Sequence, residues 1–395
     1  VGSGKTFVAA IACLYAISSS VQAAVMAPTE LLAEQHWQNF TAWFANLGIQ
    51  LAWLSGSQKQ SDRKHSLAAI ADGSAQLVIG THALFQEGVE FKNLALIVID
   101  EQHRFGVHQR VALRNKGAAN GGQPHQLVMT ATPIPRTLAM AAYADLDTSV
   151  IDELPPGRQP VQTVALPDTR RGDVVARVRR ACEEGHQAYW VCPLIEESDV
   201  LDYQAAEVSY EMLKDALPSL EIGLVHGRMS ASERDQVMRR FKNGEIEVLV
   251  ATTVIEVGVD VPNASLMIIE NAERMGLSQL HQLRGRVGRG AAQSHCVLMY
   301  RQPLGQLAKS RLAVLRDSND GFVVAQRDLE LRGPGELLGT RQTGLPQYRV
   351  ADLLRDAQLM PGVQQAAESI SRSSPQLASA IVRRWTGDPG QYGKV

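Results

Sequence analysis

The chain begins with residue types that bind phosphate. Gly4, Lys5 and Thr6 form the end of the pattern G-x-x-x-x-G-K-[ST]. In this pattern backbone N–H groups surround phosphate oxygens, the lysine reaches the β- and γ-phosphates, and the hydroxyl contacts Mg²⁺ at a helix N-terminus. Because the first glycine of the pattern would precede the chain, we interpret the chain as the C-terminal part of a longer nucleotide-driven protein.

A second element ends in carboxylates. Ala95–Ile99 is an apolar run followed directly by Asp100 and Glu101. In a phosphate-loop architecture this strand end faces the phosphates, so Asp100 could hold Mg²⁺, directly or through water, and Glu101 could orient and deprotonate the attacking water. An acidic strand end that is simply solvated is the alternative, and the phosphate-binding residues upstream favour the nucleotide interpretation.

A third element supplies positive charge. Arg286 and Arg289 lie three residues apart, on or beside a predicted helix, so their side chains can point the same way. Across a cleft from Lys5 they would neutralise the charge that develops on the γ-phosphate, as arginine fingers do. A solvated basic segment that binds nucleic acid is the alternative. Gln282 and the spacing of glycines and arginines favour the nucleotide role.

Composition limits the class of protein. A length of 395 residues predicts two to three domains. The 45% hydrophobic and 20% charged content is typical of globular proteins, and no apolar run reaches the roughly 18 residues of a membrane span. The 4 cysteines form no C-x-x-C pair, which argues against disulfides or zinc and favours a reducing cytoplasm. A net charge of −2 argues against a uniformly basic, nucleic-acid-binding surface but allows a local basic track.

Hydrophobic patterning predicts the elements that position these residues. Near-continuous apolar runs alternate with amphipathic stretches such as Glu30–Leu47 and His65–Ala71, which indicates parallel sheets covered by helices on both faces. Ser230 and Glu233 predict a helix start with a capping box. The expected strands are Ala23–Ala27, Gln50–Leu54, Gln76–Gly80, Ala95–Ile99 and Gln126–Thr130, then Val161–Leu166, Ala188–Pro193, Ile222–Val225, Val248–Thr252, Leu266–Glu270 and Cys296–Met299.

Domain boundaries follow from the same pattern. The Pro- and Gly-rich stretch Leu154–Pro160 predicts a linker between the two runs of strands. From about Leu304 the strand signal stops and helical patterning remains. We therefore predict domains at residues 1–154, 155–303 and 304–395, the last of them a helical extension.

Asp100-Glu101-Gln102-His103 resembles the D-E-x-H box of superfamily 2 helicases, and further segments resemble the other helicase motifs in order. Leu329–Gly344, together with the segments around Glu101–Val107 and Thr130–Thr137, resembles the RecG family of branch-migration helicases, and its translocation motif is shared with the transcription-repair coupling factor. The other matching segments are Ala27–His36, Gly80–Leu84, Thr130–Leu138, His226–Met229, Ala251–Pro262 and Gln279–Gly290.

The resemblance implies an α/β fold of two tandem RecA-like parallel-sheet domains, the P-loop NTPase helicase core, followed by a helical C-terminal extension. It implies ATP hydrolysis with Mg²⁺, coupled to the remodelling of branched double-stranded DNA such as Holliday junctions and stalled replication forks in recombination and repair. The family's N-terminal wedge domain would lie outside this chain. Single-stranded DNA-binding protein as a partner, a monomeric state and a bacterial, cytoplasmic, nucleoid-associated location are further expectations.

The resemblance also assigns residues. For ATP it implies Gly2, Ser3, Gly4, Lys5 and Thr6, with Gln282 and with Asp260 at the ribose. Each assignment has an alternative. The threonines could simply cap strand ends, and His103 could be a buried structural histidine. Asp260 could be a turn aspartate, and the segment 328–344 a packed surface loop. For DNA contact and coupling the resemblance implies Thr29, Thr81, His103, Thr130, Thr132, His226, Arg228, Thr252, Thr253, Arg327, Arg332, Arg341 and Gln342.

Two competing functions remain open from the sequence. A transcription-repair coupling factor has the same kind of motor and a different task, and the agreement of Thr340–Gly344 favours the RecG family. A non-catalytic, nucleotide-switched DNA-binding scaffold is the alternative of another class. Intact Lys5, Asp100, Glu101, Arg286 and Arg289 argue against it, because a protein that only binds need not keep all of them.

Overall fold

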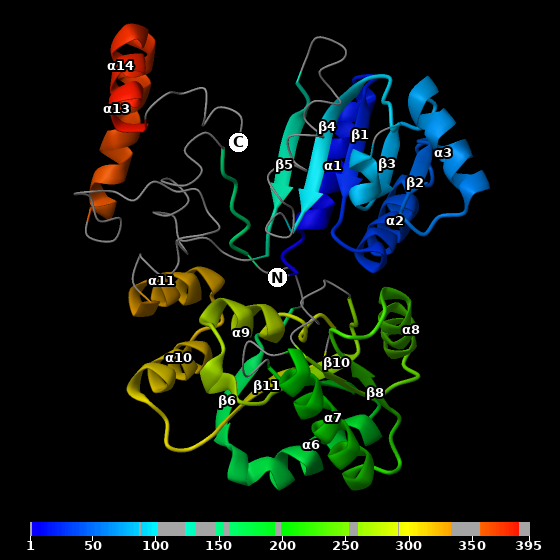
Figure 1. The fold of residues 1–395 in the computed structure, drawn as a ribbon, viewed down its shortest axis with the longest axis vertical. Helices are drawn as coiled ribbons and strands as arrows, with labels where there is room; N and C mark the ends of the chain where they lie inside the picture. The colour runs from blue at the N-terminus through cyan, green and yellow to red at the C-terminus, as the bar shows by residue number, and fades with distance from the viewer. Residues whose placement is uncertain are drawn as a thin grey trace.

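Two parallel β-sheets, one in each half of the chain, form the two lobes of the molecule (Figure 1). The computed structural model describes all residues except 1, 87, 102–122, 132–146, 154–157, 194–198, 253–259, 291, 333–355 and 387–395. The predicted linker Leu154–Pro160 therefore lies partly outside the described residues. No helix in the described part of the chain is long and apolar enough to cross a membrane.

The first sheet has the strand order β2-β3-β1-β4-β5, and all of its described pairings are parallel. Each strand coincides with a predicted one to within one residue at either end. The strands are β1 (Gln22–Met26), β2 (Leu51–Leu54), β3 (Leu77–Gly80), β4 (Leu94–Asp100) and β5 (His125–Met129).

Helices cover this sheet on both faces. They are α1 (Lys5–Ser18), α2 (Glu30–Phe44), α3 (Gln60–Asp72) and the 3₁₀ turn η1 (His82–Phe85). The prediction of a helix to Leu47 was three residues too long, because the Leu47 N–H donates to the Phe44 carbonyl in a tighter turn before Gly48. Conversely, α3 begins five residues before the predicted His65.

The second sheet has the order β6-β11-β10-β7-β9-β8, again parallel throughout. Its strands match the predicted segments to within two residues. Ser230 and Glu233 form the predicted capping box at the start of α8. The elements are β6 (Gln162–Pro167), η4 (Asp168–Arg170), α6 (Arg171–Glu183), β7 (Gln187–Val191), α7 (Asp199–Ala216), β8 (Ile222–Val225), α8 (Ala231–Lys242), β9 (Val248–Ala251), β10 (Ala264–Ile269), η6 (Ala272–Arg274), α9 (Leu277–Arg284) and β11 (His295–Tyr300).

The C-terminal part is helical, as predicted. Leu312, Leu315 and Val324, from the first two of these helices, join the apolar core on one face of the second sheet. The last two helices lie apart from the second sheet (Figure 1). The boundaries proposed at residues 154 and 303 stay predictions. The elements are α10 (Gln306–Asp317), α11 (Gly321–Arg332), η7 (Ala357–Leu359), α13 (Met360–Ser373) and α14 (Pro375–Thr386).

Each sheet separates two apolar cores. Along β1, Ala24 and Met26 belong to one core, while Ala23 and Val25 belong to the other. Successive side chains of a strand point to opposite faces, so a strand covered on both sides needs apolar residues at every position. This requirement explains the continuous apolar runs in the sequence and identifies the strand ends as the places where polar side chains can gather.

The second sheet repeats all strands of the first and adds β6 at one edge. In chain order β1 to β5 correspond to β7 to β11, and the spatial order is the same in both sheets. The register agrees as well: Met26 pairs with Gly80 and Ile99, and Val191 pairs with Ala251 and Ile269. The residues that follow are therefore equivalent, Thr81 with Thr252 and Asp100 with Glu270.

Two buried glutamines confirm this correspondence. The side-chain amide of Gln22 donates to the carbonyls of Ile70 and Ala75, at 3.0 and 2.8 Å. The amide of Gln187, at the start of β7, donates in the same way to the carbonyls of Phe241 and Ile246, at 2.6 and 2.7 Å. A buried amide must be hydrogen-bonded, and both sheets meet this need with the same local structure.

Candidate functional site

The residues predicted to bind phosphate form a turn that leads into α1. Gly2 and Gly4 have φ angles of 70° and 90°, a left-handed conformation that glycine adopts without steric cost. Among the described residues no side chain caps the first turn of α1, and a β-carbon on Gly4 would meet nothing within 4 Å. The turn therefore offers uncapped backbone N–H groups and open space at a helix N-terminus, which is a suitable place for an anion.

Lys5 lies where charged residues of both sheets converge. Burial is the main cause that lowers the pKa of Lys5. Asp100 and Glu101 from the first sheet raise this pKa, while Arg289 and Arg286 from the second half lower it. The structure thus brings Lys5 within electrostatic range of the other four predicted catalytic residues, two from each half of the chain.

The carboxylates lie at the carboxyl end of β4. Asp100 is 9% exposed, and its Oδ2 lies 3.0 Å from Nε2 of His36, a buried residue of α2. The Glu101 N–H donates to Oδ1 of Asp100 at 3.0 Å. Glu101 itself has a φ of 51°, an uncommon conformation for a residue with a side chain. The backbone therefore has an uncommon conformation at the strand end that carries the two carboxylates.

Sequence reasoning missed His36. Leu32, His36 and Phe40 follow one another at four-residue intervals on the buried face of α2. A single histidine between two apolar residues at helical spacing indicates a buried polar group, which must find a partner. The sequence contained this signal, although it could not identify Asp100 as the partner.

The arginines follow α9 rather than belonging to it. The helix ends at Arg284, and the Arg286 N–H donates to the Leu283 carbonyl in the turn that follows. Arg286 is 3% exposed. Arg289 is half-buried, and its Nη1 lies 3.1 Å from Oδ1 of Asp260. Arg289 and Asp260, both predicted to serve ATP, are therefore in direct contact.

Helix α2 of the first half contacts the second half of the chain. Gln35 Oε1 accepts a hydrogen bond from the Asp260 N–H at 3.2 Å. Glu34 forms an ion pair with Arg239 of α8 at 2.6 Å, and both side chains are partly exposed. His36 and Gln35 are neighbours, so one helix holds the carboxylate of the first sheet and the aspartate of the second.

The residues at this site suit a nucleotide with Mg²⁺. Thr6 and Asp100 offer hydroxyl and carboxylate oxygens, the hard ligands that Mg²⁺ prefers, and Mg²⁺ takes few protein ligands because it keeps several waters. Lys5, Arg286 and Arg289 offer cationic donors for phosphate oxygens. Within the described residues no cluster of three or more His, Cys, Asp or Glu could hold a metal by itself, so the fit is to a metal shared with phosphate.

The threonines predicted for DNA contact differ in their surroundings. Thr29 caps α2, accepting the Leu32 N–H at 3.4 Å. Thr81 and Thr252 are each 2% exposed, and within the described residues their hydroxyls have no hydrogen-bond partner. Their N–H groups donate to equivalent carbonyls, of Leu54 and Val225, at 3.2 Å each. Thr130 follows β5.

The other predicted residues are more dispersed. Gln282 is half-buried in α9. His226 and Arg228 follow β8, and burial lowers the pKa of His226. Arg327 on α11 forms an exposed ion pair with Glu330 at 2.8 Å. Outside the described residues lie His103, Thr132, Thr253, Arg341 and Gln342, and so does the side chain of Arg332.

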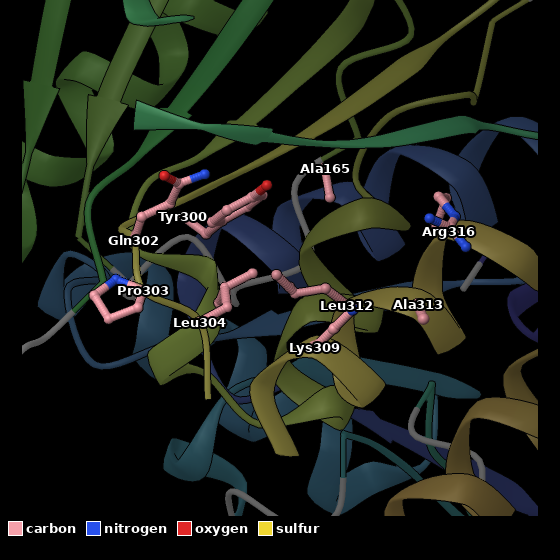
Figure 2. A pocket seen from close by; sticks show the side chains of 9 residues that line it. All are labelled: Ala165, Tyr300, Gln302, Pro303, Leu304, Lys309, Leu312, Ala313 and Arg316. Carbon is pink, nitrogen blue, oxygen red and sulfur yellow. The ribbon is translucent and has the colours of Figure 1, made fainter. Parts of the chain in front are cut away.

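A separate cavity of about 750 Å³ lies at the edge of the second sheet, beside α10 (Figure 2). Tyr300 and Leu312 line it, with Lys309 and Arg316 at its rim. Arg316 is held by Asp317 at 2.8 Å. None of the lining residues belongs to the converging cluster around Lys5, so this cavity is not the candidate nucleotide site.

Three family models match successive parts of the chain. The DEAD/DEAH box helicase model covers residues 1–141 and the helicase conserved C-terminal domain covers residues 173–291. The model of ATP-dependent DNA helicase RecG, domain 3, C-terminal, covers residues 318–382. These matches agree with the fold of two parallel-sheet domains followed by a helical part.

Curated relatives carry the name ATP-dependent DNA helicase RecG. The Escherichia coli protein is 66% identical over 100% of this chain, the Haemophilus influenzae protein 62% over 100%, and the Bacillus subtilis protein 48% over 94%. The chain spans 57%, 57% and 54% of the length of these three proteins.

Solved structures give the same result. A RecG structure bound to a three-way DNA junction matches with a TM-score of 0.75 and 46% identity, over 91% of this chain and 46% of that one. The helicase MrfA bound to DNA matches with a TM-score of 0.61 and 16% identity, over 84% of this chain and 48% of that one, which shows the fold alone. With its motifs, its paired sheets and a similarity to these relatives that extends over 94% to 100% of the chain, the chain belongs to the RecG family of superfamily 2 helicases.

Proposed function

We propose that this chain is the motor of an ATP-driven double-stranded DNA translocase that remodels branched DNA. The observation that carries the proposal is the convergence of Lys5, Asp100 and Glu101 from the first sheet with Arg286 and Arg289 from the second half. Groups that bind phosphate on one lobe and groups that neutralise phosphate on the other form a complete site only when the lobes meet. Hydrolysis is then linked to their relative movement.

Each residue of the cluster has a separate task in this proposal. The backbone of the turn at Gly2 to Gly4 and the Lys5 ammonium bind the phosphates, and Thr6 and Asp100 would hold Mg²⁺, which supplies compensating charge. Glu101 orients the attacking water and accepts its proton. Arg286 and Arg289 stabilise the charge on the γ-phosphate in the transition state. Gln282 and Asp260 complete the nucleotide contacts, Asp260 at the ribose.

His36 has a role in this proposal, because it contacts the Asp100 carboxylate. A histidine that donates from Nε2 to a carboxylate fixes the orientation of that carboxylate, as the hydrogen-bonded surroundings of metal ligands usually do. With Oδ2 turned toward His36 and Oδ1 toward the Glu101 N–H, the rotamer of Asp100 is set before any ligand binds. We infer that His36 positions this carboxylate.

DNA contact is proposed at the strand ends of both sheets. Thr81 and Thr252 hold equivalent places after their strands, where hydroxyl and backbone N–H groups can meet phosphates. Their hydroxyls are buried and lack a partner within the described residues, so each would have to become exposed to donate to a phosphate. Contacts to phosphates carry no sequence information, which suits a motor that moves over any DNA. Proposed alongside them for DNA contact or coupling are Thr29, Thr130, Thr132, Thr253, His103, His226, Arg228, Arg327, Arg332, Arg341 and Gln342.

Three further expectations remain proposals. They are a single-stranded DNA-binding protein as a partner, a monomeric state, and a place at the nucleoid in the bacterial cytoplasm. The coupling-factor alternative is not favoured, since the relatives at 48% to 66% identity carry the RecG name. The non-catalytic scaffold is not favoured either, because a protein that only binds DNA would not need all five residues of the cluster around Lys5.

Phosphate release with and without a three-way DNA junction tests the proposal. We expect the junction to stimulate hydrolysis, and Glu101→Gln to abolish it while ATP binding persists, because the base is lost and the phosphate turn is kept. Glu90→Gln, at an exposed glutamate of the same lobe, serves as the matched control and should hydrolyse normally. Junction-independent hydrolysis, or normal turnover by Glu101→Gln, would contradict the proposal.

A further inference from the structure

Arg158, just before β6, joins the two halves of the candidate site. Its Nη1 donates to the carbonyl of Gly2 at 2.9 Å, and its Nε donates to the carbonyl of Gly288 at 2.9 Å. Gly2 lies in the phosphate-binding turn, and Gly288 directly precedes Arg289. One guanidinium group therefore links the turn that precedes Lys5 to the loop that carries the arginines.

Both carbonyls that accept from Arg158 belong to glycines. Gly2 and Gly288 have positive φ angles, 70° and 77°. A β-carbon at Gly2 would lie 2.3 Å from Nη1 of Arg158, and one at Gly288 would lie 2.8 Å from Cγ2 of Val161. A side chain at Gly2 would therefore displace the guanidinium group, whereas a side chain at Gly288 would meet Val161.

Arg158 lies among charged groups that are predicted to serve ATP. Burial lowers the pKa of Arg158, the neighbouring Arg289 lowers it further, and Asp260 raises it. Arg289 is itself paired with Asp260 at 3.1 Å, so two guanidinium groups share one carboxylate. Two guanidinium groups and one carboxylate therefore lie together beside the turn that precedes Lys5 and the loop that carries the arginines.

The two hydrogen bonds also set the direction of backbone donors. In a trans peptide the C=O and the following N–H point in opposite directions. A donor on the Gly2 carbonyl therefore turns the Ser3 N–H away from Arg158, and a donor on the Gly288 carbonyl fixes the peptide from which Arg289 extends. Both effects need Arg158 to reach both lobes at once.

We propose that Arg158 is a positioning residue for ATP hydrolysis, which aligns the phosphate-binding turn with the arginine loop when the two lobes close. The inference rests on the proposed ATPase function. The planar fork of arginine is essential to it, because a lysine ammonium is a single point and cannot donate from two separated nitrogens to two carbonyls on different lobes.

Steady-state ATP hydrolysis of Arg158→Ala and Arg158→Lys tests this assignment. We expect kcat/KM for ATP to fall about 10²-fold in both, the usual scale for misplaced reacting groups, with KM raised through the phosphate turn and kcat lowered through Arg289. Arg316→Ala, at an exposed arginine with its own ion-pair partner, should match the unaltered protein. Wild-type kinetics in Arg158→Lys would overturn the proposal, since charge alone would then suffice.

A double-mutant cycle separates positioning from a merely structural role. If Arg158 acts on kcat through Arg289, then adding Arg158→Ala to Arg289→Ala should cause no further loss of kcat. Fully additive losses of kcat would overturn the proposal. Absence of hydrolysis in the unaltered protein would instead contradict the ATPase function itself, so the two failures can be told apart.

Discussion

The two sheets place a carboxylate at the same position and surround it differently. Asp100, after β4, contacts a histidine ring and a backbone N–H. Its equivalent Glu270, after β10, accepts on Oε1 from Trp190 Nε1 at 2.5 Å and from Ser209 at 3.2 Å, and forms an ion pair with Arg171 at 2.6 Å. The contacts of Asp100 leave its charge available to a bound cation, whereas Arg171 neutralises Glu270 directly.

The helix before the central strand accounts for this difference. In the first sheet α1 begins with Lys5, preceded by glycines that leave its N-terminus open. In the second sheet the equivalent helix α6 begins with Arg171, whose guanidinium group contacts Glu270 and lies 5.7 Å from the centre of the Trp190 ring. The guanidinium group of Arg171 therefore neutralises the Glu270 carboxylate of the second sheet.

Other features are the same in both sheets. The buried glutamines Gln22 and Gln187 bind equivalent carbonyls, and Thr81 and Thr252 end equivalent strands. The scaffold is thus shared, and the chemistry depends on a few side chains placed at the strand ends and at the helix start. In the proposed function the first lobe carries the hydrolytic site, and the second lobe supplies arginines to it.

The largest expected effect concerns the arginines of the second lobe. Arg289→Ala should lower turnover by about 10³-fold, the usual scale for an arginine finger, even though Arg289 pairs with Asp260 in the present structure. The matched control is Arg240→Ala, at an exposed arginine paired with Glu221 and Glu245, which should turn over normally. Near-normal hydrolysis by Arg289→Ala would show that the second lobe contributes no finger.

A smaller effect is expected from the shared threonines. Thr81→Val and Thr252→Val should each raise the DNA concentration for half-maximal stimulation of hydrolysis about tenfold, the scale of one hydrogen bond to a charged group. Stability without DNA should not fall, because the buried hydroxyls have no partner among the described residues. Thr163→Val is the matched control, since its buried hydroxyl also lacks a described partner but lies within β6. If all three variants needed the same DNA concentration for half-maximal stimulation, Thr81 and Thr252 would not contact DNA, and the prediction would be wrong.

Much of this architecture was accessible from the sequence. Parallel strands covered on both faces leave long apolar runs, so β4 and β10 could be located from the pattern of Ala95–Ile99 and Leu266–Glu270. Lys5, Asp100 and Arg289 stood in short motifs whose spacing along the chain is specific. These features are local in the sequence, so they can be recognised without knowledge of the fold.

The contacts between distant segments were not accessible. Arg158 was assigned only to a Pro- and Gly-rich linker, because nothing in its neighbours indicates that it reaches both Gly2 and Gly288. The spacing of His36 between apolar residues indicated that it is buried, but it did not identify Asp100 as its partner. Such pairings depend on how whole elements pack, which single-residue patterns do not encode.

The central claim is that equivalent carboxylates serve hydrolysis in one sheet and stability in the other. Asp100→Asn and Glu270→Gln, measured side by side for ATP turnover and for unfolding, test it most directly. We predict that Asp100→Asn lowers turnover about 10³-fold through loss of a metal ligand and lowers stability less than Glu270→Gln does, through weaker hydrogen bonds to His36 and to the Glu101 N–H. Glu270→Gln should keep turnover and lower the free energy of unfolding by about 3 kcal/mol, because Arg171 loses its partner. Equal effects of the two variants on turnover would contradict the claim.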